Sequence, residues 1–485
     1  MVSRRKIASS IQSWRTFAAS SSGEQAFPRQ GRASVDPDVQ EAIRRGDYKP
    51  RHHPGHLGVP TVDLPEHLWV AAQKQLSLYD LKPLKLGAAR LANVLSMRKP
   101  PLSDREMYAK AAEVKADIVD RFKRKAQRAG TTWPPEDETE EEQEQRIQKL
   151  QRVVAKRMRS IVYNWRPIVF NTEAKCLMYL IARLAPNYAV TLRVLKEIKQ
   201  RVPDFLPHTV FDYGSGLGTL YWVCQSLWPG IIKEMYTVDT SSDMNDLAGN
   251  LLMNHLGYIP QEISMRQFLS ARSDPSYDLV FSAYSLMECP EAEQRLSVVE
   301  NLWRKTSGFL VFVENGTRAG YRLILEARDH LLRIIKDIDC VDGSIFAPCP
   351  HQLECPRAEH RLPCNFPAAY LPFKFVGTKR DAEYDLFSYV AFRKGERPKE
   401  LLGSRVVGDP LRRHRHIWCD VCSQRGLLEK VVMTKLQGGT ELYRIAKATS
   451  WGDLLPAVAV GGQKEEVKEG PDSSRRDDEV TSDDC

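Results

Sequence analysis

Apolar and polar positions follow two different periods along this chain of 485 residues. Between residues 64 and 201 the apolar positions recur every three to four residues, which is typical of amphipathic helices. Between residues 209 and 327 short apolar runs alternate with helical stretches, which predicts a parallel, doubly wound sheet. We therefore expect a helical N-terminal region over residues 24–201 and an α/β core over residues 202–340.

Local signals mark the ends of several expected helices. Ser103 and Glu106 have the spacing of a capping box, in which each side chain bonds to the backbone of the other residue. The helix that follows is expected to run to Ala129, before a glycine. Two further helices are expected at residues 172–184 and 187–200, on either side of a proline.

A glycine-rich turn inside the α/β core is the main functional signal. Asp212 ends an apolar run, glycines follow at alternate positions, and a helical pattern then begins; the glycines are Gly214, Gly216 and Gly218. Strand, tight turn and helix form the setting of a nucleotide-binding loop, because glycine lets the backbone approach a ligand closely and the helix start offers free N–H groups. Asp239 ends the next expected strand, where one carboxylate can accept hydrogen bonds from both ribose hydroxyls.

The spacing of these glycines indicates which cofactor the loop binds. An NAD fingerprint would place its third glycine one position after Gly218. The spacing found here resembles instead the first motif of class I S-adenosylmethionine-dependent methyltransferases. The candidate cofactor-binding residues are therefore Asp212, Gly214, Gly216, Gly218 and Asp239.

Residues for methyl transfer are harder to find. Methyltransferases that act on nucleic-acid amino groups carry Asn/Asp-Pro-Pro-Tyr/Phe after the fourth strand, where this chain has Ser282 to Leu286. Cys289 lies nearby, but its neighbours do not match the enzymes that use a thiolate against cytosine. We assign no catalytic residue, and a methyltransferase fold kept for binding fits better than an active enzyme. An active S-adenosylmethionine-dependent rRNA methyltransferase is the alternative.

The charge distribution suggests a polyanionic partner. The formal net charge is +8, but residues 464–485 hold four basic and nine acidic side chains, so the rest carries +13. A further seven acids fall within residues 136–144. Such a basic remainder favours RNA, although a solvated basic surface would have the same composition. No apolar run reaches the roughly 20 residues of a membrane span.

Cysteines gather near the C-terminus. Five of the ten lie between Cys349 and Cys422, and prolines and histidines surround them, which suggests a metal site in a reducing compartment. Three cysteines in a proline-rich loop, Cys349, Cys355 and Cys364, could enclose a metal together with one distant cysteine. Spacing alone slightly favours zinc over an iron–sulfur cluster, and it does not separate Cys419 from Cys422 as the distant ligand. Cys419 and Cys422 also fit half of a zinc site, with His414 or His416 as alternative ligands.

Both ends of the chain have unusual compositions. Residues 1–23 are basic and rich in serine, and apolar residues recur at helical spacing before the first acid, Glu24. These features match a mitochondrial transit peptide, with a disordered basic tail as the alternative. Residues 461–485 form a polar, acidic tail that we expect to be disordered.

Two shorter segments give further expectations. His52, His53 and His56 stand beside proline and glycine, which favours a polar loop or a nucleic-acid contact over a metal site. The segment from Val431 to Leu455 predicts strands and a short closing piece.

Several stretches are specific enough to compare with known families. They are Asp212–Gly218, Leu302–Lys305, Val313–Thr317, Phe346–His351 and Ser450–Pro456. Together they resemble the family of mitochondrial methyltransferase-like protein 17 and its fungal counterparts in the small mitoribosomal subunit, over about His52 to Pro456. Many methyltransferases share the glycine motif, whereas the cysteine loop and the Trp-Gly-Asp-Leu-Leu-Pro stretch are much more specific.

The resemblance implies a location and a function. Members are mitochondrial matrix proteins that assist assembly of the small ribosomal subunit. They bind ribosomal RNA between the head and body of the immature subunit, next to ribosomal proteins, and support mitochondrial translation. The resemblance also implies a class I methyltransferase-like fold with an S-adenosylmethionine pocket, without methyl transfer, and a C-terminal cysteine-rich module that holds a 4Fe–4S cluster.

The resemblance also assigns the cluster ligands. Cys349, Cys355 and Cys364 fall on the family's loop ligands, although the spacing before Cys364 varies among members. Cys422 falls on the fourth ligand, which leaves the other cysteine of that pair spare. The implied cluster replaces the spacing preference for zinc, and its module would span residues 341–460 together with strands that complete the sheet.

Overall fold

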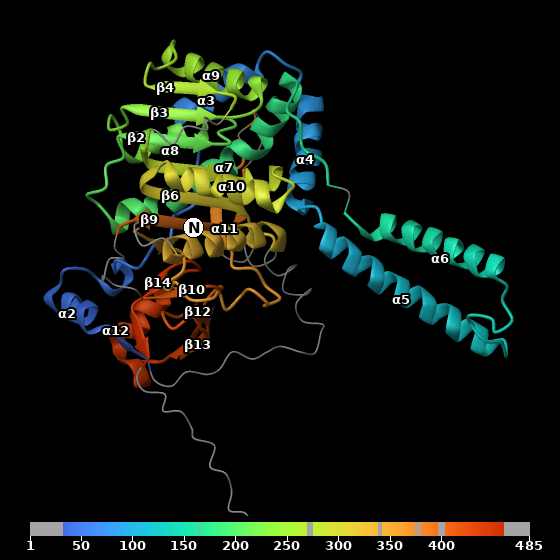
Figure 1. Ribbon diagram of the computed structural model, residues 1–485. Coiled ribbons are helices and arrows are strands. Elements are labelled where there is room, and N and C mark those ends of the chain that lie inside the picture. The colour runs from blue at the N-terminus through green and yellow to red at the C-terminus, as the bar shows by residue number, and fades with distance from the viewer. Residues whose placement is uncertain are drawn as a thin grey trace, which may run out of the picture.

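The computed structural model describes residues 33–163, 165–268, 275–337, 342–373, 375, 380–395 and 403–459. The expected transit peptide and acidic tail lie outside these residues. A layered α/β body carries a smaller β module at one end and a projecting pair of helices at its side (Figure 1). No helix in the described ranges is long and apolar enough to cross a membrane.

A mixed sheet forms the centre of the body. Its order is β4-β3-β2-β5-β6-β9-β7, with β8 also paired to β9. The strands are β2 (Thr209–Tyr213), β3 (Glu234–Val238), β4 (Ile263–Arg266), β5 (Tyr277–Ala283), β6 (Thr306–Asn315), β7 (Gly343–Ala347), β8 (Phe366–Tyr370) and β9 (Glu383–Lys394). Neighbours from β4 to β6 are parallel, but β9 runs antiparallel to both β6 and β7. The parallel sheet predicted for residues 209–327 is therefore confirmed, and the strands that complete it beyond this range include the antiparallel β9, which the chain reaches from the cysteine loop without a crossover helix.

Helices cover both faces of the sheet. They are α3 (Glu66–Leu76), α4 (Leu81–Met97), α7 (Glu173–Arg201), α8 (Thr219–Leu227), α9 (Ser242–Leu256), α10 (Ala292–Arg304) and α11 (Arg318–Asp337). The side chains of α3, α7, α8 and α9 join one core cluster, and those of α10 and α11 join the other. Adjacent residues of β5 divide between the clusters, with Val280 in one and Phe281 in the other, because side chains alternate along a strand.

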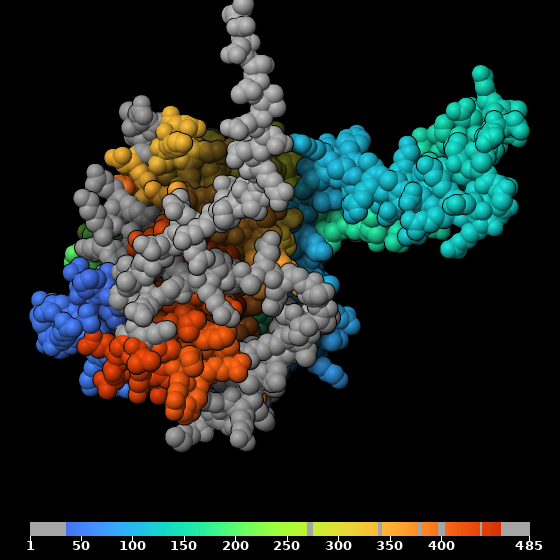
Figure 2. Space-filling view, turned by 90° about the horizontal axis from the view of Figure 1, so that it is seen from below, coloured from blue at the N-terminus to red at the C-terminus, as the bar shows by residue number. Residues whose placement is uncertain are grey.

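Two helices form an arm that projects from the body (Figure 1, Figure 2). They are α5 (Asp104–Arg128) and α6 (Glu140–Ile161), and each begins with a capping box, at Ser103 as predicted and at Thr139. A separate small core joins them, and its buried members are Val114, Ile118, Leu150 and Met158. Because the two helices bury their apolar faces on each other, most of their remaining surface is exposed.

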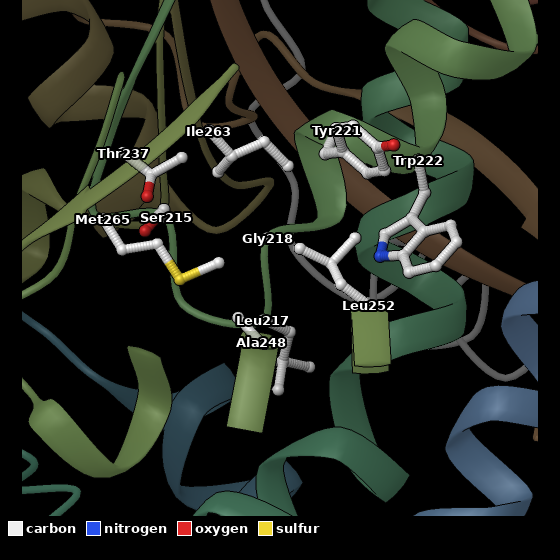
Figure 3. A pocket seen from close by; sticks show the side chains of 10 residues that line it. All are labelled: Ser215, Leu217, Gly218, Tyr221, Trp222, Thr237, Ala248, Leu252, Ile263 and Met265. Carbon is white, nitrogen blue, oxygen red and sulfur yellow. The ribbon is translucent and has the colours of Figure 1, made fainter. Parts of the chain in front are cut away.

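A small hollow remains beneath the glycine-rich turn, between α8, α9 and the strands β3 and β4 (Figure 3). Its lining is mostly apolar and includes Leu217, Leu252, Ile263 and Met265. Its volume is about 10 Å³, which is close to the smallest space that holds one water molecule. Gly218 of the predicted cofactor-binding set lines it, but Gly216 and Asp239 do not, and because of its small size we interpret it as a gap in core packing.

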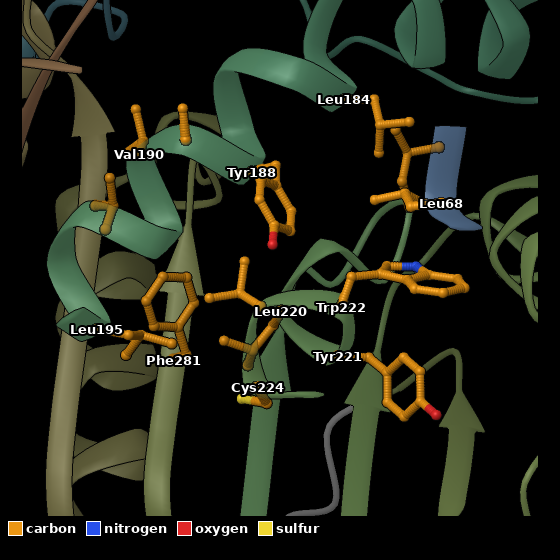
Figure 4. Close-up of a cluster of buried hydrophobic side chains, with 14 of the residues drawn as sticks. Leu68, Leu184, Tyr188, Val190, Leu195, Leu220, Tyr221, Trp222, Cys224 and Phe281 are labelled. Carbon is orange, nitrogen blue, oxygen red and sulfur yellow. The ribbon is translucent and has the colours of Figure 1, made fainter. Parts of the chain in front are cut away.

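Helix α7 is continuous, although the sequence predicts two helices there. Pro186 lies inside it, where a proline removes one backbone hydrogen bond at a cost of about 3 kcal/mol. Residues on both sides of the proline, such as Leu184 and Ala189, are completely buried. Figure 4 shows Tyr188 of α7 beside Leu220 and Trp222 of α8 in this core. Burial of both halves therefore outweighs the local penalty that the prediction relied on.

A second sheet in the described ranges forms the C-terminal module. Its antiparallel strands are β10 (Ser404–Val406), β11 (Leu411–Arg412), β12 (Ile417–Cys422), β13 (Leu428–Met433) and β14 (Leu454–Leu455). Helix α12 (Lys435–Ala448) covers it, so the prediction of only strands in this region is wrong. Leu442, Ile445 and Ala446 have helical spacing and are completely buried. This signal is short, and the helix breaks at Gly439.

The two ends of the described chain are held together. Strand β1 (Ala33–Val35) pairs antiparallel with β15 (Ala457–Ala459), and the short helices α2 (Pro37–Arg45) and η1 (Pro50–His52) follow β1. The histidine-rich segment then docks on Asp453, whose buried carboxylate accepts hydrogen bonds from His56 Nδ1 at 2.8 Å and from the Leu57 N–H at 2.9 Å.

Two of the three histidines therefore have structural roles. His53 is buried, and its Nδ1 accepts the Gly55 N–H at 3.1 Å, so of the two expectations it fits the polar loop and not the nucleic-acid contact. The hydrogen bond to Asp453 raises the pKa of His56, whereas burial lowers the pKa of His53 to about 4.

The His56–Asp453 pair predicts a pH-dependent contribution to stability. Because the folded pKa of His56 is raised, its contribution is fully present below the unfolded pKa of about 6.5 and is lost as pH rises through the folded pKa. We expect the difference in Tm between wild type and His56→Gln to be largest near pH 5.5 and to shrink towards pH 8.5. Comparing the two proteins at each pH cancels the opposite contribution of His53. A constant difference across this range would contradict the prediction.

Candidate functional site

The glycine-rich turn has the geometry of a tight loop between β2 and α8. Gly214, Gly216 and Gly218 all have positive φ angles, 72°, 51° and 65°, which strongly favour glycine. A Cβ atom on Gly214 would lie 2.0 Å from the Ser285 hydroxyl oxygen, whereas one on Gly216 would meet no atom within 4 Å. Gly214 therefore serves internal packing, and Gly216 faces open space.

Asp239 ties the end of β3 to this loop. Its two carboxylate oxygens accept the Gly216 N–H and the Ser241 N–H, each at 2.9 Å. Burial raises the pKa of Asp239, and these two hydrogen bonds partly offset the effect. A carboxylate has about four acceptor positions, so capacity remains for two ribose hydroxyls.

The side chains at the ends of the neighbouring core strands lie at the same edge of the sheet, because β3, β2, β5 and β6 are neighbours in that order. Asp212 is buried, and its burial together with the charge of Asp239 raises its pKa to about 8. Burial raises the pKa of Glu314 to about 7, and the Met287 N–H donates to one of its oxygens at 3.2 Å. Among the described residues, the second oxygen of Glu314 and the Ser282 hydroxyl have no hydrogen-bond partner.

A segment without regular secondary structure, residues 165–172 before α7, connects the ends of two core strands, and we call it the strap. The Phe170 carbonyl accepts the Ser241 hydroxyl at 2.5 Å beside the end of β3. The Trp165 indole N–H donates to the Met287 carbonyl at 3.3 Å, in the turn that follows β5. The sequence predicts no role for the strap, because a segment outside helices and strands has no periodic pattern of apolar residues.

A second candidate site lies at the cysteine loop. The four predicted cluster ligands line one pocket there. Cys349, Cys355, Cys364 and Cys422 all line it. None of the eight cysteines in the described ranges forms a disulfide. The rest of the wall consists of prolines, arginines and aliphatic side chains, namely Pro348, Pro350, Pro356, Arg357, Arg405, Val407 and Leu428.

The structure separates the two cysteines that spacing could not. Cys419 lies with Ile417 and Val421 in the apolar core of the C-terminal module and is completely buried. Residues three apart on a strand face opposite sides, so Cys422 points away from that core and into the pocket.

Polar side chains surround the cysteine pocket. The Tyr321 hydroxyl lies 3.2 Å from Cys355 Sγ, and His351 Nε2 lies 3.3 Å from Cys422 Sγ. Burial raises the pKa of Cys364 to about 12, and the nearby Arg357 charge opposes this effect. Deprotonated sulfurs here would therefore need a positive partner, such as a metal centre, in addition to the arginines.

The donor set permits a test of the implied metal groups. In the described ranges no three His, Cys, Asp or Glu side chains stand close enough to share one metal ion. Zinc would hold all four sulfurs about 2.3 Å from a single point. A four-iron cluster holds its thiolates further apart, because each sulfur binds a different iron. The four cysteines match the donor set of a four-iron cluster in number and type, and the space between them is about 10 Å³.

A buried ionic network connects this pocket to the body. Glu197 of α7 is 1% exposed and pairs with Arg405 of β10 at 2.6 Å, Arg201 at 3.0 Å and Arg193 at 3.4 Å. Arg405 also donates to the Pro348 carbonyl at 2.8 Å in the cysteine loop. Burial disfavours the Glu197 charge, but the three arginines outweigh it and lower the pKa of Glu197 to about 2.

The strand order, the antiparallel β9 and the glycine loop after β2 define a class I methyltransferase-like α/β protein, here joined to a four-cysteine module. The family described as "Mitochondrial small ribosomal subunit Rsm22" matches residues 173–456, and the chain belongs to this family. This result confirms the resemblance found in the sequence.

Three relatives are similar over different lengths. The human "Ribosome assembly protein METTL17, mitochondrial" is 35% identical, with 87% of this chain and 89% of that protein covered. The Saccharomyces cerevisiae "Ribosome assembly protein RSM22, mitochondrial" is 20% identical, with coverage of 56% and 65%. A Schizosaccharomyces pombe "Rsm22-cox11 tandem protein 2, mitochondrial" is 26% identical, and the match spans 43% of that protein. Among solved structures, magnesium protoporphyrin IX methyltransferase from Synechocystis is 14% identical with a TM-score of 0.29, covering 50% of this chain and 95% of that one.

Replacing Gly214 or Gly216 with alanine should lower the free energy of unfolding by different amounts. Gly216→Ala should destabilise by about 1–2 kcal/mol, because alanine is strained at positive φ. Gly214→Ala should cost more, since its methyl group also meets Ser285. Urea unfolding of both variants measures the difference, and Gly214→Ala/Ser285→Gly should recover part of the extra loss. Equal losses for the two single variants would contradict this account.

The buried network predicts a large loss when its carboxylate is neutralised. Glu197→Gln leaves three arginines without their shared counter-charge, so we expect a loss of about 3–5 kcal/mol in the free energy of unfolding. The matched control is Asp120→Asn in the exposed Asp120–Arg124 pair of the arm, which should change stability by less than about 1 kcal/mol. Urea unfolding at pH 7 measures both, and a loss for Glu197→Gln as small as the control's would contradict the role of the network.

Proposed function

We propose that this protein is a mitochondrial matrix factor that assists assembly of the small ribosomal subunit. In this proposal it binds ribosomal RNA between the head and body of the immature subunit, next to ribosomal proteins, and so supports mitochondrial translation. Family membership over residues 173–456 carries the proposal. The human and Saccharomyces cerevisiae relatives are both named mitochondrial ribosome assembly proteins, and the strongly basic remainder of this chain suits an RNA partner.

We propose further that Cys349, Cys355, Cys364 and Cys422 bind a 4Fe–4S cluster. Support comes from their common pocket, from the prolines that shape the loop, and from the nearby arginines, whose charges balance anionic sulfur. A bound cluster would link the cysteine loop to β12, so that folding of the C-terminal module depends on it.

The open space beside Gly216 and Asp239, which we call the crevice, is proposed to bind S-adenosylmethionine without methyl transfer. Gly216 faces open space there, and Asp239 has acceptor capacity for the ribose. Asp212 and Glu314 are 4% and 0% exposed, which keeps their carboxyl groups from reaching a substrate as general bases. An active rRNA methyltransferase remains the alternative function.

Serine substitutions at the two cysteines of the Cys-x-x-Cys pair test the cluster and its role together. Purified under anaerobic conditions, wild type and the matched control Cys419→Ser should contain iron and sulfide and show an iron–sulfur optical and EPR signature. Cys422→Ser should lose most of its iron and should no longer sediment with small-subunit particles from mitochondrial extract. Equal iron in both variants, or zinc in the wild type, would overturn the cluster.

Wild-type protein that sediments only as a free monomer would overturn the assembly role. An rRNA methyl mark that disappears in Asp239→Asn while assembly continues would favour the active methyltransferase.

A further inference from the structure

The end of the arm and the strap together carry charge of only one sign. Residues 145–172 contain no aspartate or glutamate, whereas soluble protein surfaces usually mix both signs. Seven of these residues are basic, namely Arg146, Lys149, Arg152, Lys156, Arg157, Arg159 and Arg166. The positive charges of such a run repel one another, and binding of an anionic partner would relieve this repulsion.

Four of these residues form one stripe along α6. Lys149, Arg152, Lys156 and Arg159 are three or four positions apart, so they lie on one side of the helix, and all four are exposed. The opposite side of α6 packs on α5 through Leu150 and Met158. At a rise of 1.5 Å per residue the stripe is about 15 Å long. We call these four residues the α6 stripe.

The neighbouring helix provides an internal comparison. On α5, basic residues alternate with acids and form exposed ion pairs, Lys110 with Glu113 at 2.6 Å and Arg124 with Asp120 at 3.2 Å. In the described part of the chain, no member of the α6 stripe forms an ion pair. Arg146 near the start of α6 does pair with Glu138 at 2.8 Å, so the difference in pairing belongs to the stripe and not to the arm as a whole.

The position of the stripe leaves it accessible to a large partner. The arm stands away from the body in two perpendicular views (Figure 1, Figure 2). The stripe ends near Tyr163, which is 37% exposed, and the strap then continues to the edge of the crevice. An exposed aromatic ring beside unpaired cations suits nucleic acid, because the cations meet phosphates and the ring can stack on a base. Leu150 and Met158 of α6 are already buried against α5, which disfavours insertion of this helix into a lipid surface.

We propose that the α6 stripe binds the phosphate backbone of RNA, and that the arm is an RNA-binding element of this protein. The inference rests on the proposed function and names the surface that would perform it. Cations spaced along one side of a rod contact a backbone and read no base edges, so binding by the stripe is independent of sequence and sensitive to salt.

Two quadruple variants with equal changes in net charge test the proposal. The first replaces Lys149, Arg152, Lys156 and Arg159 with glutamine, and the control replaces the exposed Arg105, Lys115, Arg121 and Arg124 of α5 with glutamine. Glutamine keeps helix propensity, and circular dichroism checks that both variants fold. Binding of a small-subunit rRNA fragment to the full chain is measured by fluorescence anisotropy between 50 and 300 mM KCl.

We expect the α6 variant to bind at least about tenfold more weakly than wild type at low salt. Its slope of log affinity against log salt should be smaller by roughly 3, at 0.7–0.9 per lost phosphate contact. The control should stay within about twofold of wild type. An equal loss of RNA affinity in both variants would show that only the net charge of the protein matters. This result would contradict the proposal that the α6 stripe binds RNA.

Unchanged RNA affinity in the α6 variant would also overturn the stripe. If that variant still failed to sediment with small-subunit particles, the stripe would bind a protein instead. The proposed function fails separately, if wild-type protein neither binds the RNA nor sediments with the particles.

Discussion

The buried carboxylate of Glu197 and its three arginines hold the two halves of this protein in register. Glu197 belongs to α7, at the centre of the methyltransferase-like body, and Arg405 belongs to the C-terminal module. Removing either partner would leave a buried charge unpaired at a cost of several kcal/mol, so this pairing ties the stability of each half to the other. Arg405 also bonds to the carbonyls of Pro348 and Gly452, which extends the constraint to the cysteine loop and to the Trp-Gly-Asp-Leu-Leu-Pro stretch.

The cysteine pocket is a consequence of this arrangement. Its first three cysteines follow β7 of the main sheet, whereas Cys422 comes from β12 of the module, so the pocket exists only where the two parts meet. Arg405 lines the pocket while it pairs with Glu197. A cluster bound here would therefore stabilise the same junction that the ionic network stabilises. Its loss would lower the stability of α7 as well as that of the module.

The body and the arm divide the surface chemistry of the molecule between them. At the crevice, the strap and the burial of Asp212 and Glu314 limit access to the strand ends. On the arm, two helices satisfy each other's apolar faces and leave the α6 stripe without counter-charges among the described residues. A protein that uses a methyltransferase-like fold as a scaffold for assembly would need this combination, with cofactor chemistry restrained and contact surface exposed.

The sequence by itself determined the features that depend on residues close together in the chain. The capping box at Ser103, the glycine loop, the order of the core elements and the three cysteines of one loop all follow from local spacing, and the structure contains each of them. Only the tertiary structure decided the rest. Burial on both sides kept α7 intact across Pro186, the facing of β12 selected Cys422, and Glu197 found Arg405 at a separation of 208 residues. These outcomes depend on contacts between residues that are far apart in the chain. A local sequence pattern does not contain this information.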